Sequence, residues 1–288
     1  MSVRAFQDLW RGMWRHPLKT VQHVFTSFSV IFTLVKAVTH FIPAIKIEGR
    51  LALGLAIAVS VIYGLWKVWK PSRIEIPIAN CNTVIEVLFG DLFVQDGIRA
   101  IAVSEFFESK LGKPVSDRSI HGIFLQRCFP GGPESFDSRI DEQLRGVEYT
   151  EVPQKVEGKT KCYPIGTTAL ITVNHDRYLL FAFTRTDPST CKVSSNIKLM
   201  WDSLYQLWQR ARAEAGGYAI NLPLVGSGLS GLGLPTRDLL NLIILSIITE
   251  TKAREITQRI RIVLHRDRFD GLDLRDVKEH WEDKANGV

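Results

Sequence analysis

Two long apolar runs stand near the start of the chain, and neither shows the polar face of a helix on a soluble core. The stronger run, LALGLAIAVSVIYGLWKVW, covers residues 51–69 and has no charge before Lys67. At ~1.5 Å per residue it is long enough to cross about 30 Å of hydrocarbon. Tyr63, Trp66 and Trp69 suit a membrane–water interface. We therefore predict a transmembrane helix here, with a buried core helix as the alternative.

The second run, residues 21–44, contains VFTSFSVIFTLV, whose hydroxyls can bond back to the preceding helical turn. Lys36 and His40 interrupt it. A lysine at this depth is costly unless it reaches the interface or faces protein. Lys36 therefore either extends toward the interface or lines a helix–helix or subunit contact. The short connection predicts that both runs form a transmembrane hairpin over residues 21–70.

Charge is divided unevenly along the chain. The whole sequence has 36 Lys and Arg against 30 Asp and Glu, and residues 1–73 hold ten and two of them, which leaves 26 and 28 for the remainder. The basic pI of about 9.2 therefore does not indicate nucleic acid as a partner. The basic residues flank the predicted hairpin, so the positive-inside rule places both termini in the cytoplasm of a multi-pass protein. Residues 1–20 suit a basic amphipathic segment at the bilayer surface.

After residue 73 the pattern changes to short β-rich runs that alternate with amphipathic ones. Strands are predicted at residues 74–79, 83–89, 98–103, 167–173, 178–184, 218–225 and 259–264. Helices are predicted at residues 104–111, from the cap at residues 194–196 to Gly216, after Pro235, and at residues 273–284. Residues 167–184 form a hairpin, the strands at 83–89 and 98–103 bracket a turn at Gly90-Asp91, and residues 130–160 are irregular. The alternation favours one α/β domain over residues 74–288, with a mixed or parallel sheet covered by helices.

Four cysteines lie scattered without zinc-binding spacing or neighbouring histidines, so we expect no metal site and a reducing compartment.

The segment with the most specific chemistry is NLPLVGSGLSGLGLP, residues 221–235. An apolar strand ends in four glycines and runs into a helix. Glycine lets the backbone turn sharply and approach a ligand, and exposed amides with a helix N-terminus favour an anion. The loop follows a strand's carboxyl end, where open α/β sheets bind ligands. No Gly-Lys-Ser/Thr follows, so it is not a P-loop. The alternative is a flexible loop without a ligand.

A second candidate is Phe89-Gly90-Asp91-Leu92-Phe93. An acid just after a strand can accept hydrogen bonds from an adenine amino group or a ribose hydroxyl, although an acid after glycine also serves ordinary turns.

Together these motifs resemble the macro domain, an ADP-ribose-binding α/β/α fold. The series VSEFF, SIHG, YPIGTT and PLVGSGLSG, beginning at Val103, Ser119, Tyr163 and Pro223, is similar to the divergent macro domain of type II Thoeris effectors. Those bacterial antiphage proteins join N-terminal transmembrane helices to this domain, the same order as here. The resemblance covers most of residues 74–265.

The resemblance implies a non-enzymatic effector of the bacterial inner membrane. A TIR-domain partner would produce an ADP-ribose derivative, histidine-ADP-ribose, and its binding would drive homo-oligomerisation and disruption of the lipid bilayer, killing the infected cell. By position, Asp91 would meet the adenine, and Leu92 beside it is also a candidate ligand-binding residue. Diphosphate would lie on the loop of Gly226, Ser227, Gly228, Leu229, Ser230 and Gly231. Around the distal ribose or its attached group would lie Ser104, Glu105, Ser119 and His121.

One departure from the family concerns catalysis. Macro domains that hydrolyse ADP-ribose esters usually carry an asparagine-rich stretch after the second strand, where this chain has Ser104-Glu105-Phe106. This favours sensing over hydrolysis. His121 could act as a general base, or it could be a structural or ligand-contacting residue. A membrane-tethered ADP-ribosyl hydrolase is therefore the alternative function, and a scaffold whose loop only packs is a third.

Overall fold

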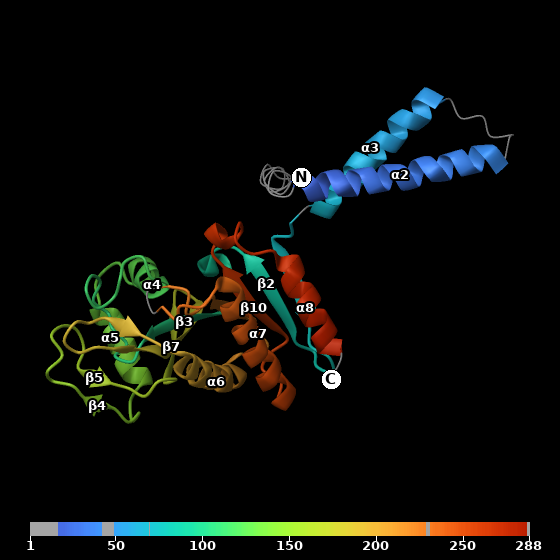
Figure 1. Cartoon of the computed structure of the whole chain (residues 1–288). Coiled ribbons are helices and arrows are strands. Elements are labelled where there is room, and N and C mark those ends of the chain that lie inside the picture. The colour runs from blue at the N-terminus through green and yellow to red at the C-terminus, as the bar shows by residue number, and fades with distance from the viewer. Residues whose placement is uncertain (1–16, 42–48, 69, 229–230, 287–288) are drawn as a thin grey trace. The chain divides into compact units, whose positions relative to one another are not determined.

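The computed structural model describes residues 17–41, 49–68, 70–228 and 231–286, and contacts within the chain divide it into two compact units, Met1–Pro71 and Ser72–Val288 (Figure 1). The predicted amphipathic segment at residues 1–20 lies, up to residue 16, outside the described residues.

The first unit contains two helices, α2 (Pro17–Phe41) and α3 (Gly49–Val68). Their hydroxyls bond back along the helix as the sequence predicts: Thr33 Oγ1 donates to the Ser29 carbonyl at 2.8 Å. The two helices touch where a Cβ on Gly64 would lie 2.3 Å from Val24 Cγ2, so glycine permits this close approach. Lys36 is exposed with its ammonium 5.4 Å from the Phe32 ring centroid, a position that leaves both interpretations of this lysine open.

Most large apolar side chains of α2 and α3 face outward, and Leu55 is 62% exposed. By length and composition, one stretch among the described residues could cross a membrane: Thr20–Val38 in α2, of 19 residues. The apolar part of α3, Gly49–Leu65, is shorter. From the sequence, residues 51–69 are the stronger transmembrane candidate, whereas by helix length the stretch in α2 is the stronger one. The two-helix transmembrane hairpin stays a prediction.

The second unit is built on one mixed sheet, in which the described strands follow the order β1-β2-β10-β9-β3-β7-β6, with β8 on the end of β7. The strands are β1 (Arg73–Pro77), β2 (Val84–Phe89), β3 (Ile98–Ser104), β6 (Thr168–Val173), β7 (Asp176–Thr186), β8 (Val193–Ser194), β9 (Ile220–Pro223) and β10 (Arg259–Leu264). The five from β2 to β7 are parallel, and β1, β6 and β8 are antiparallel to their neighbours. A separate ribbon pairs β4 (Thr150–Glu151) with β5 (Lys161–Cys162).

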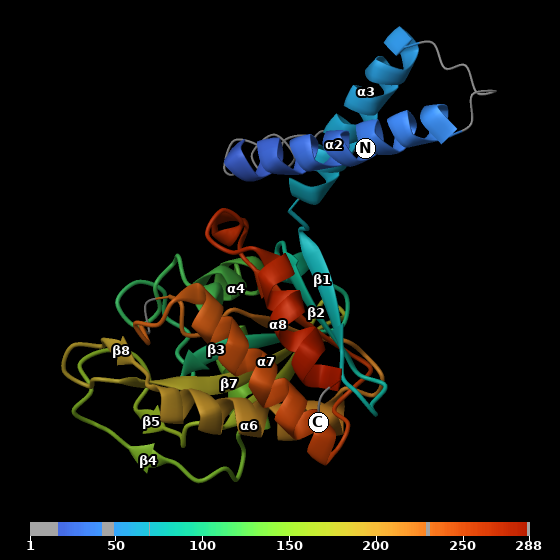
Figure 2. The same cartoon turned by 45° about the vertical axis from the view of Figure 1, so that its right-hand side comes forward.

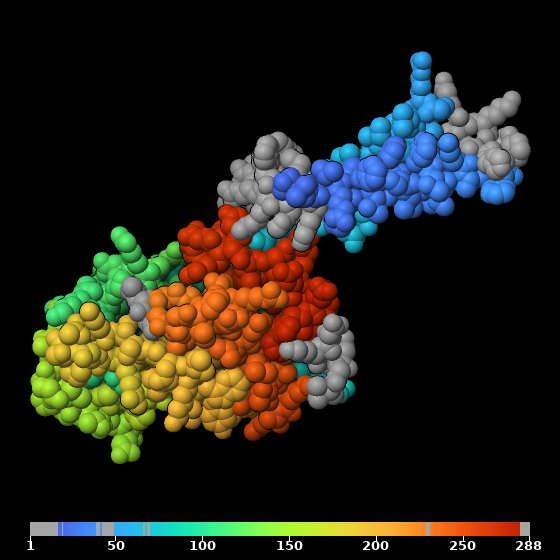
Figure 3. All heavy atoms as spheres, in the orientation of Figure 1, coloured from blue at the N-terminus to red at the C-terminus, as the bar shows by residue number. Residues whose placement is uncertain are grey.

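Helices cover both faces of the sheet. One face packs against α6 (Ile197–Glu214), α7 (Thr236–Ala253) and α8 (Leu274–Asn286), which form a continuous layer in Figure 3. Figure 2 shows α8 lying along β1 and β2. The other face packs against α4 (Ile120–Cys128) and α5 (Glu134–Gln143). Short 3-10 turns, η1 (Leu92–Val94) and η2 (Arg266–Arg268), follow β2 and β10. The predicted α/β/α architecture is confirmed.

Several predicted elements are confirmed with small changes of bounds. Strands β6 and β7 form the expected hairpin, and Asn174 and His175 take the positive φ angles of a tight two-residue turn. Asn196 caps α6 by accepting from the Leu199 amide at 2.9 Å. The strand expected at residues 218–225 is shorter, because Tyr218 is still in the turn after α6.

Two predictions of local structure are wrong. The helix expected at residues 104–111 is absent from this described segment, because Glu105 continues the sheet by donating from its amide to the Thr184 carbonyl at 2.9 Å, and Phe107 takes φ +47°. Residues 130–160 include the regular helix α5, whose buried Phe136 and Ile140 lie one turn apart among polar residues.

Strands β2 and β3 bracket Gly90-Asp91 in the chain as predicted, and in the sheet β10 and β9 lie between them.

Candidate functional site

A cavity of about 310 Å³ opens at the carboxyl edge of the sheet, between β3 and β9. These strands pair only at their first residues, Ile98 with Ile220 and Arg99 with Asn221. Beyond that point β3 continues beside β7, whereas β9 leads into the glycine loop, so the strands β3 and β9 diverge. The crevice between diverging parallel strands is the usual ligand position in open α/β sheets.

The glycine loop forms one wall of this cavity through Gly226, Ser227 and Gly228. Gly226 has φ +82° and a Cβ there would lie 2.4 Å from Leu232, so both its backbone and its surroundings require glycine. Among the described residues, the amides of Gly226 and Gly228 donate no hydrogen bond. Free amides at a cavity wall form a donor surface suited to an anion.

Hydrogen bonds within the loop and from η2 hold the loop in this shape. Ser227 Oγ donates to the Leu224 carbonyl at 3.0 Å, and the Gly231 amide donates to the Gly228 carbonyl at 3.0 Å. Arg268 of η2 donates to the Ser227 carbonyl at 3.4 Å. These contacts fix the described part of the loop at Ser227, Gly228 and Gly231, which argues against the interpretation as a flexible loop.

The opposite wall is the first turn of α4. Ser119 is the N-cap and its Oγ accepts from the Gly122 amide at 2.9 Å. A Cβ on Gly122 would lie 2.2 Å from the Ser116 carbonyl oxygen, so glycine lets the helix begin this close to the preceding loop. The helix N-terminus adds positive partial charge on the side facing the glycine loop.

Two buried polar atoms at the cavity have no partner within the described residues: Ser104 Oγ at the end of β3 and His121 Nε2 on α4. Burial, and next the charge of Lys159, lower the pKa of His121 to about 3. The imidazole is therefore neutral at physiological pH. A buried donor or acceptor without a partner is costly, which makes these two atoms candidates for ligand contact.

The structure thus brings six of the residues suggested by the sequence to one cavity: Ser104, Ser119, His121, Gly226, Ser227 and Gly228. Leu229 and Ser230 lie outside the described residues.

The other suggested residues do not line the cavity. Asp91 caps η1, accepting from the Phe93 amide at 2.9 Å, and pairs with Arg127 of α4 at 3.2 Å. Leu92 is buried in the core between the sheet and α4. Glu105 turns its carboxylate away and accepts from the Thr186 amide at 2.9 Å. The Gly231 amide donates to the Gly228 carbonyl and does not reach the cavity lining.

Sequence reasoning did not anticipate the contribution of β7. The register of β3 with β7 shifts between Val103 and Ser104, which now faces Thr184, and this irregularity brings Phe183 and Thr184 to the cavity. No spacing in the sequence reports such a bulge. Arg118, directly before the α4 cap, also lines the cavity and adds a cation at its wall. Its position directly before the SIHG motif could have identified Arg118 as a candidate site residue from the sequence.

The described residues contain no group of three or more His, Cys, Asp or Glu side chains that could hold a metal ion, and the four cysteines are free thiols.

A sequence profile of the family described as Thoeris protein ThsA, Macro domain, matches residues 85–265. No curated protein matches the chain. Two solved structures of the Oceanobacillus iheyensis macrodomain, with ADP and with MES, each superimpose with a TM-score of 0.51 at 12% identity, covering 73% of this chain and 97% of theirs. A Trypanosoma brucei macrodomain in complex with ADP-ribose gives a TM-score of 0.44 at 9% identity, covering 67% and 68%. At such identities the first two neighbours establish the fold alone.

Proposed function

The chain belongs to the family of the Thoeris protein ThsA macro domain, and from this premise we propose that its cavity binds an ADP-ribose derivative as a signal. The observation that carries the proposal is the convergence of free loop amides and a helix N-terminus on one cavity at the sheet edge. Such donors recognise a diphosphate without a metal or a P-loop lysine. The O. iheyensis macrodomain, which shares the fold, was solved with ADP, and this supports a nucleotide diphosphate as the ligand class.

In this proposal the diphosphate lies on Gly226, Ser227 and Gly228. The partnerless Ser104 Oγ and His121 Nε2, together with Ser119, contact the distal ribose and the group attached to it. The adenine extends toward η1, where Asp91 is already held by Arg127 of α4. Following the family resemblance, we take histidine-ADP-ribose, made by a TIR-domain partner, as the natural ligand.

We further propose that the cavity senses its ligand and does not hydrolyse it. A general base works best when its pKa lies near the operating pH, whereas the pKa of His121 is about 3. A neutral imidazole in an apolar wall suits hydrogen bonding to a ligand better than proton abstraction.

The output is proposed to occur at a bacterial inner membrane, with both termini in the cytoplasm. The apolar stretch of α2 supports membrane insertion of this unit. Two helices from one chain do not enclose an aqueous path, so membrane disruption would need ligand-induced homo-oligomers. Ligand can drive assembly only if it binds the assembled state more tightly. The proposed result is death of the infected cell as antiphage defence.

Gly228→Trp in the full chain tests ligand binding. A Cβ at Gly228 meets nothing within 4 Å and its φ is not left-handed, so the variant should fold normally while its indole fills the cavity. Calorimetry in detergent should show about 100-fold weaker binding of histidine-ADP-ribose, equivalent to ~2.7 kcal/mol. Gly131→Trp is the matched control, since Gly131 is equally open and lies outside the cavity. Equal affinity in both variants, or no binding by the wild type, would reject the proposal.

Incubation with ADP-ribosylated substrates separates sensing from hydrolysis. We expect binding without turnover. Turnover that is lost in His121→Gln would instead establish the hydrolase alternative.

A further inference from the structure

Arg118 is the one charged side chain among the described residues that line the cavity between β3 and β9. Burial keeps the pKa of His121, the other ionisable side chain of this lining, at about 3, so its ring carries no charge at physiological pH. Asp117, the carboxylate next to Arg118 in the chain, does not line the cavity. The described lining therefore has a net positive charge and contains no acid that could bind a cationic group of a ligand.

The turn that carries Arg118 is held in place by hydrogen bonds that do not involve its side chain. The amide and the Oγ of Ser119 both donate to the Ser116 carbonyl, at 2.9 and 2.7 Å. The Arg118 amide donates to Ser116 Oγ at 3.4 Å. The first turn of α4 closes against the same carbonyl because Gly122 has no Cβ. The backbone at Arg118 is therefore preorganised, and only the side chain loses freedom when it binds a ligand.

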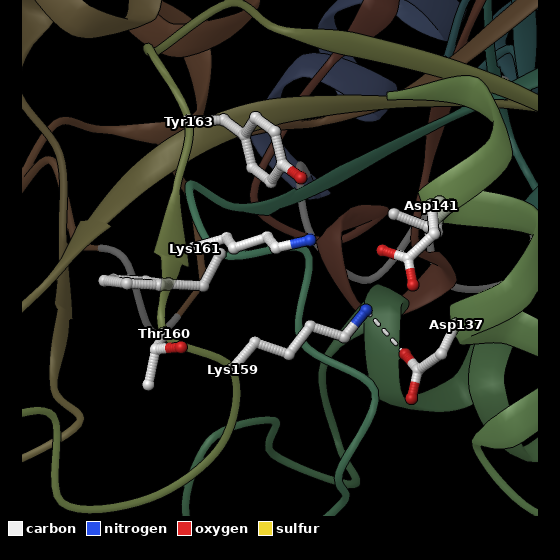
Figure 4. A pocket seen from close by; sticks show the side chains of 8 residues that line it. Asp137, Asp141, Lys159, Thr160, Lys161 and Tyr163 are labelled. Atoms are coloured by element: carbon white, nitrogen blue, oxygen red, sulfur yellow. Dashed lines mark ion pairs between the residues drawn. The ribbon is translucent and has the colours of Figure 1, made fainter. Parts of the chain in front are cut away.

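The charge of Arg118 differs from that of two other cations around α4 and α5, which already have partners. In a separate cavity of about 240 Å³ between α5 and β5, Figure 4 shows Lys159 paired with Asp137, at 2.5 Å. Lys161 of the same cavity has its Nζ 5.2 Å from the centroid of the Tyr149 ring. Within the described part of the chain, the guanidinium of Arg118 forms no ion pair. Its charge is therefore available to a ligand.

The position of Arg118 assigns it to one end of the proposed ligand. The diphosphate is proposed to lie on the glycine loop, whereas Arg118 directly precedes the cap of α4, on the opposite wall. Ser119 and His121, which are proposed to contact the distal ribose and its attached group, lie on the same wall as Arg118. A cation at this place favours an anionic attached group. The planar fork of N–H donors on arginine matches the two oxygens of a carboxylate.

We propose that Arg118 selects the ligand by its attached group, and that this group carries a carboxylate which the guanidinium binds. This assignment rests on the proposed nucleotide function and specifies its ligand. The cavity then distinguishes ADP-ribose conjugates of carboxylate-bearing amines from conjugates of amines without a carboxylate. Repulsion adds to this selectivity, because a purely cationic attached group would meet Arg118 and no compensating acid on the described lining.

Two conjugates that differ only in this carboxylate test the proposal: histidine-ADP-ribose and histamine-ADP-ribose. Calorimetry of the full chain in detergent should give an affinity for the histidine conjugate about tenfold above that for the histamine conjugate, as for a charge-assisted hydrogen bond. Equal affinities would overturn the role of Arg118 and leave the nucleotide function intact. Absence of binding of both conjugates and of ADP-ribose would instead reject the nucleotide function itself.

Variants of Arg118 distinguish a carboxylate contact from a phosphate contact. Arg118→Gln should weaken binding of histidine-ADP-ribose about tenfold and that of histamine-ADP-ribose by less than about twofold. Equal weakening of both conjugates would place the guanidinium on the diphosphate and overturn the proposal. Arg118→Lys keeps the charge without the fork and should restore part of the preference for the histidine conjugate.

Arg145→Gln is the matched control, since Arg145 is likewise an exposed arginine and does not line the cavity. It should bind both conjugates as the wild type does, and thermal unfolding checks that each variant is folded. A loss of preference for the histidine conjugate in Arg145→Gln as large as in Arg118→Gln would show a general effect of charge and so refute a direct contact.

Discussion

The two units of this chain use similar apolar residues in opposite ways. In α2 and α3 the large apolar side chains face outward, whereas both apolar cores of the α/β unit are drawn wholly from residues 74–281 and are buried. A helix satisfies its own backbone hydrogen bonds and can therefore lie in hydrocarbon, while a strand needs neighbouring strands. Apolar content alone therefore does not distinguish a segment suited to lipid from one suited to a protein core.

The largest expected effect comes from separating the units. Residues 72–288 contain both cores, so this fragment should fold and remain in the soluble fraction, while the full chain sediments with membranes. Fractionation of expressing cells followed by circular dichroism of the fragment measures both results. A fragment that aggregates, or a full chain that stays soluble without detergent, would contradict the comparison.

The same substitution placed in each unit should give unequal costs. Leu204 is fully buried in α6, and Leu204→Ala should lower the free energy of unfolding of the α/β unit by about 2–5 kcal/mol. Leu55 of α3 is 62% exposed, and Leu55→Ala should change the free energy of unfolding by less than ~0.5 kcal/mol. Thermal unfolding of the full chain in detergent compares the two. Similar shifts would mean that α3 packs against a surface not visible in the single chain.

The smallest effect concerns acid stability. His121 has a pKa of about 3 when folded against the usual 6.5, so below pH 6.5 the unfolded chain binds a proton that the folded chain does not. Stability contributed by the neutral form is thus complete above pH 6.5 and is lost as the pH falls toward 3. This side chain should give a slope that approaches ~1.4 kcal/mol per pH unit between pH 5 and 4, absent in His121→Gln.

Histidine 23 of α2 provides the control in the other unit. His23→Gln should leave the pH dependence of the stability of the α/β unit as in the wild type. Thermal unfolding of wild type, His23→Gln and His121→Gln across this pH range measures it. An equal slope in His121→Gln and in the wild type would show that burial of His121 does not cause the loss of stability at acid pH.

Much of the fold was predictable because its signals are local. Strand β10 was expected at its observed residues, and Asn196 caps α6 as its position indicated. Helix α5 was missed because only Phe136 and Ile140 mark its buried side within a strongly polar stretch. The helix expected after Ser104 was wrong, because a hydrogen bond to β7, distant in sequence, outweighs local helix propensity.

For the candidate site, the residue types by themselves pointed to the glycine loop, whereas Ser119 was suggested by the family resemblance alone. The sequence could not tell that Glu105 turns its carboxylate to the Thr186 amide, nor that Phe183 reaches the cavity through a bulge. These outcomes depend on the register between strands, which is set by packing across the whole sheet.

The two apolar runs, the alternating α/β pattern and the glycine loop after a strand were predictable from the sequence, since each follows from side-chain periodicity or backbone freedom within a few residues. Which distant segments meet depends on the tertiary structure, as where the divergence of β3 from β9 opens the candidate cavity. The physical reason is range: local conformation is encoded by adjacent residues, whereas a cavity is formed by segments that lie far apart in the chain and meet only when the core packs.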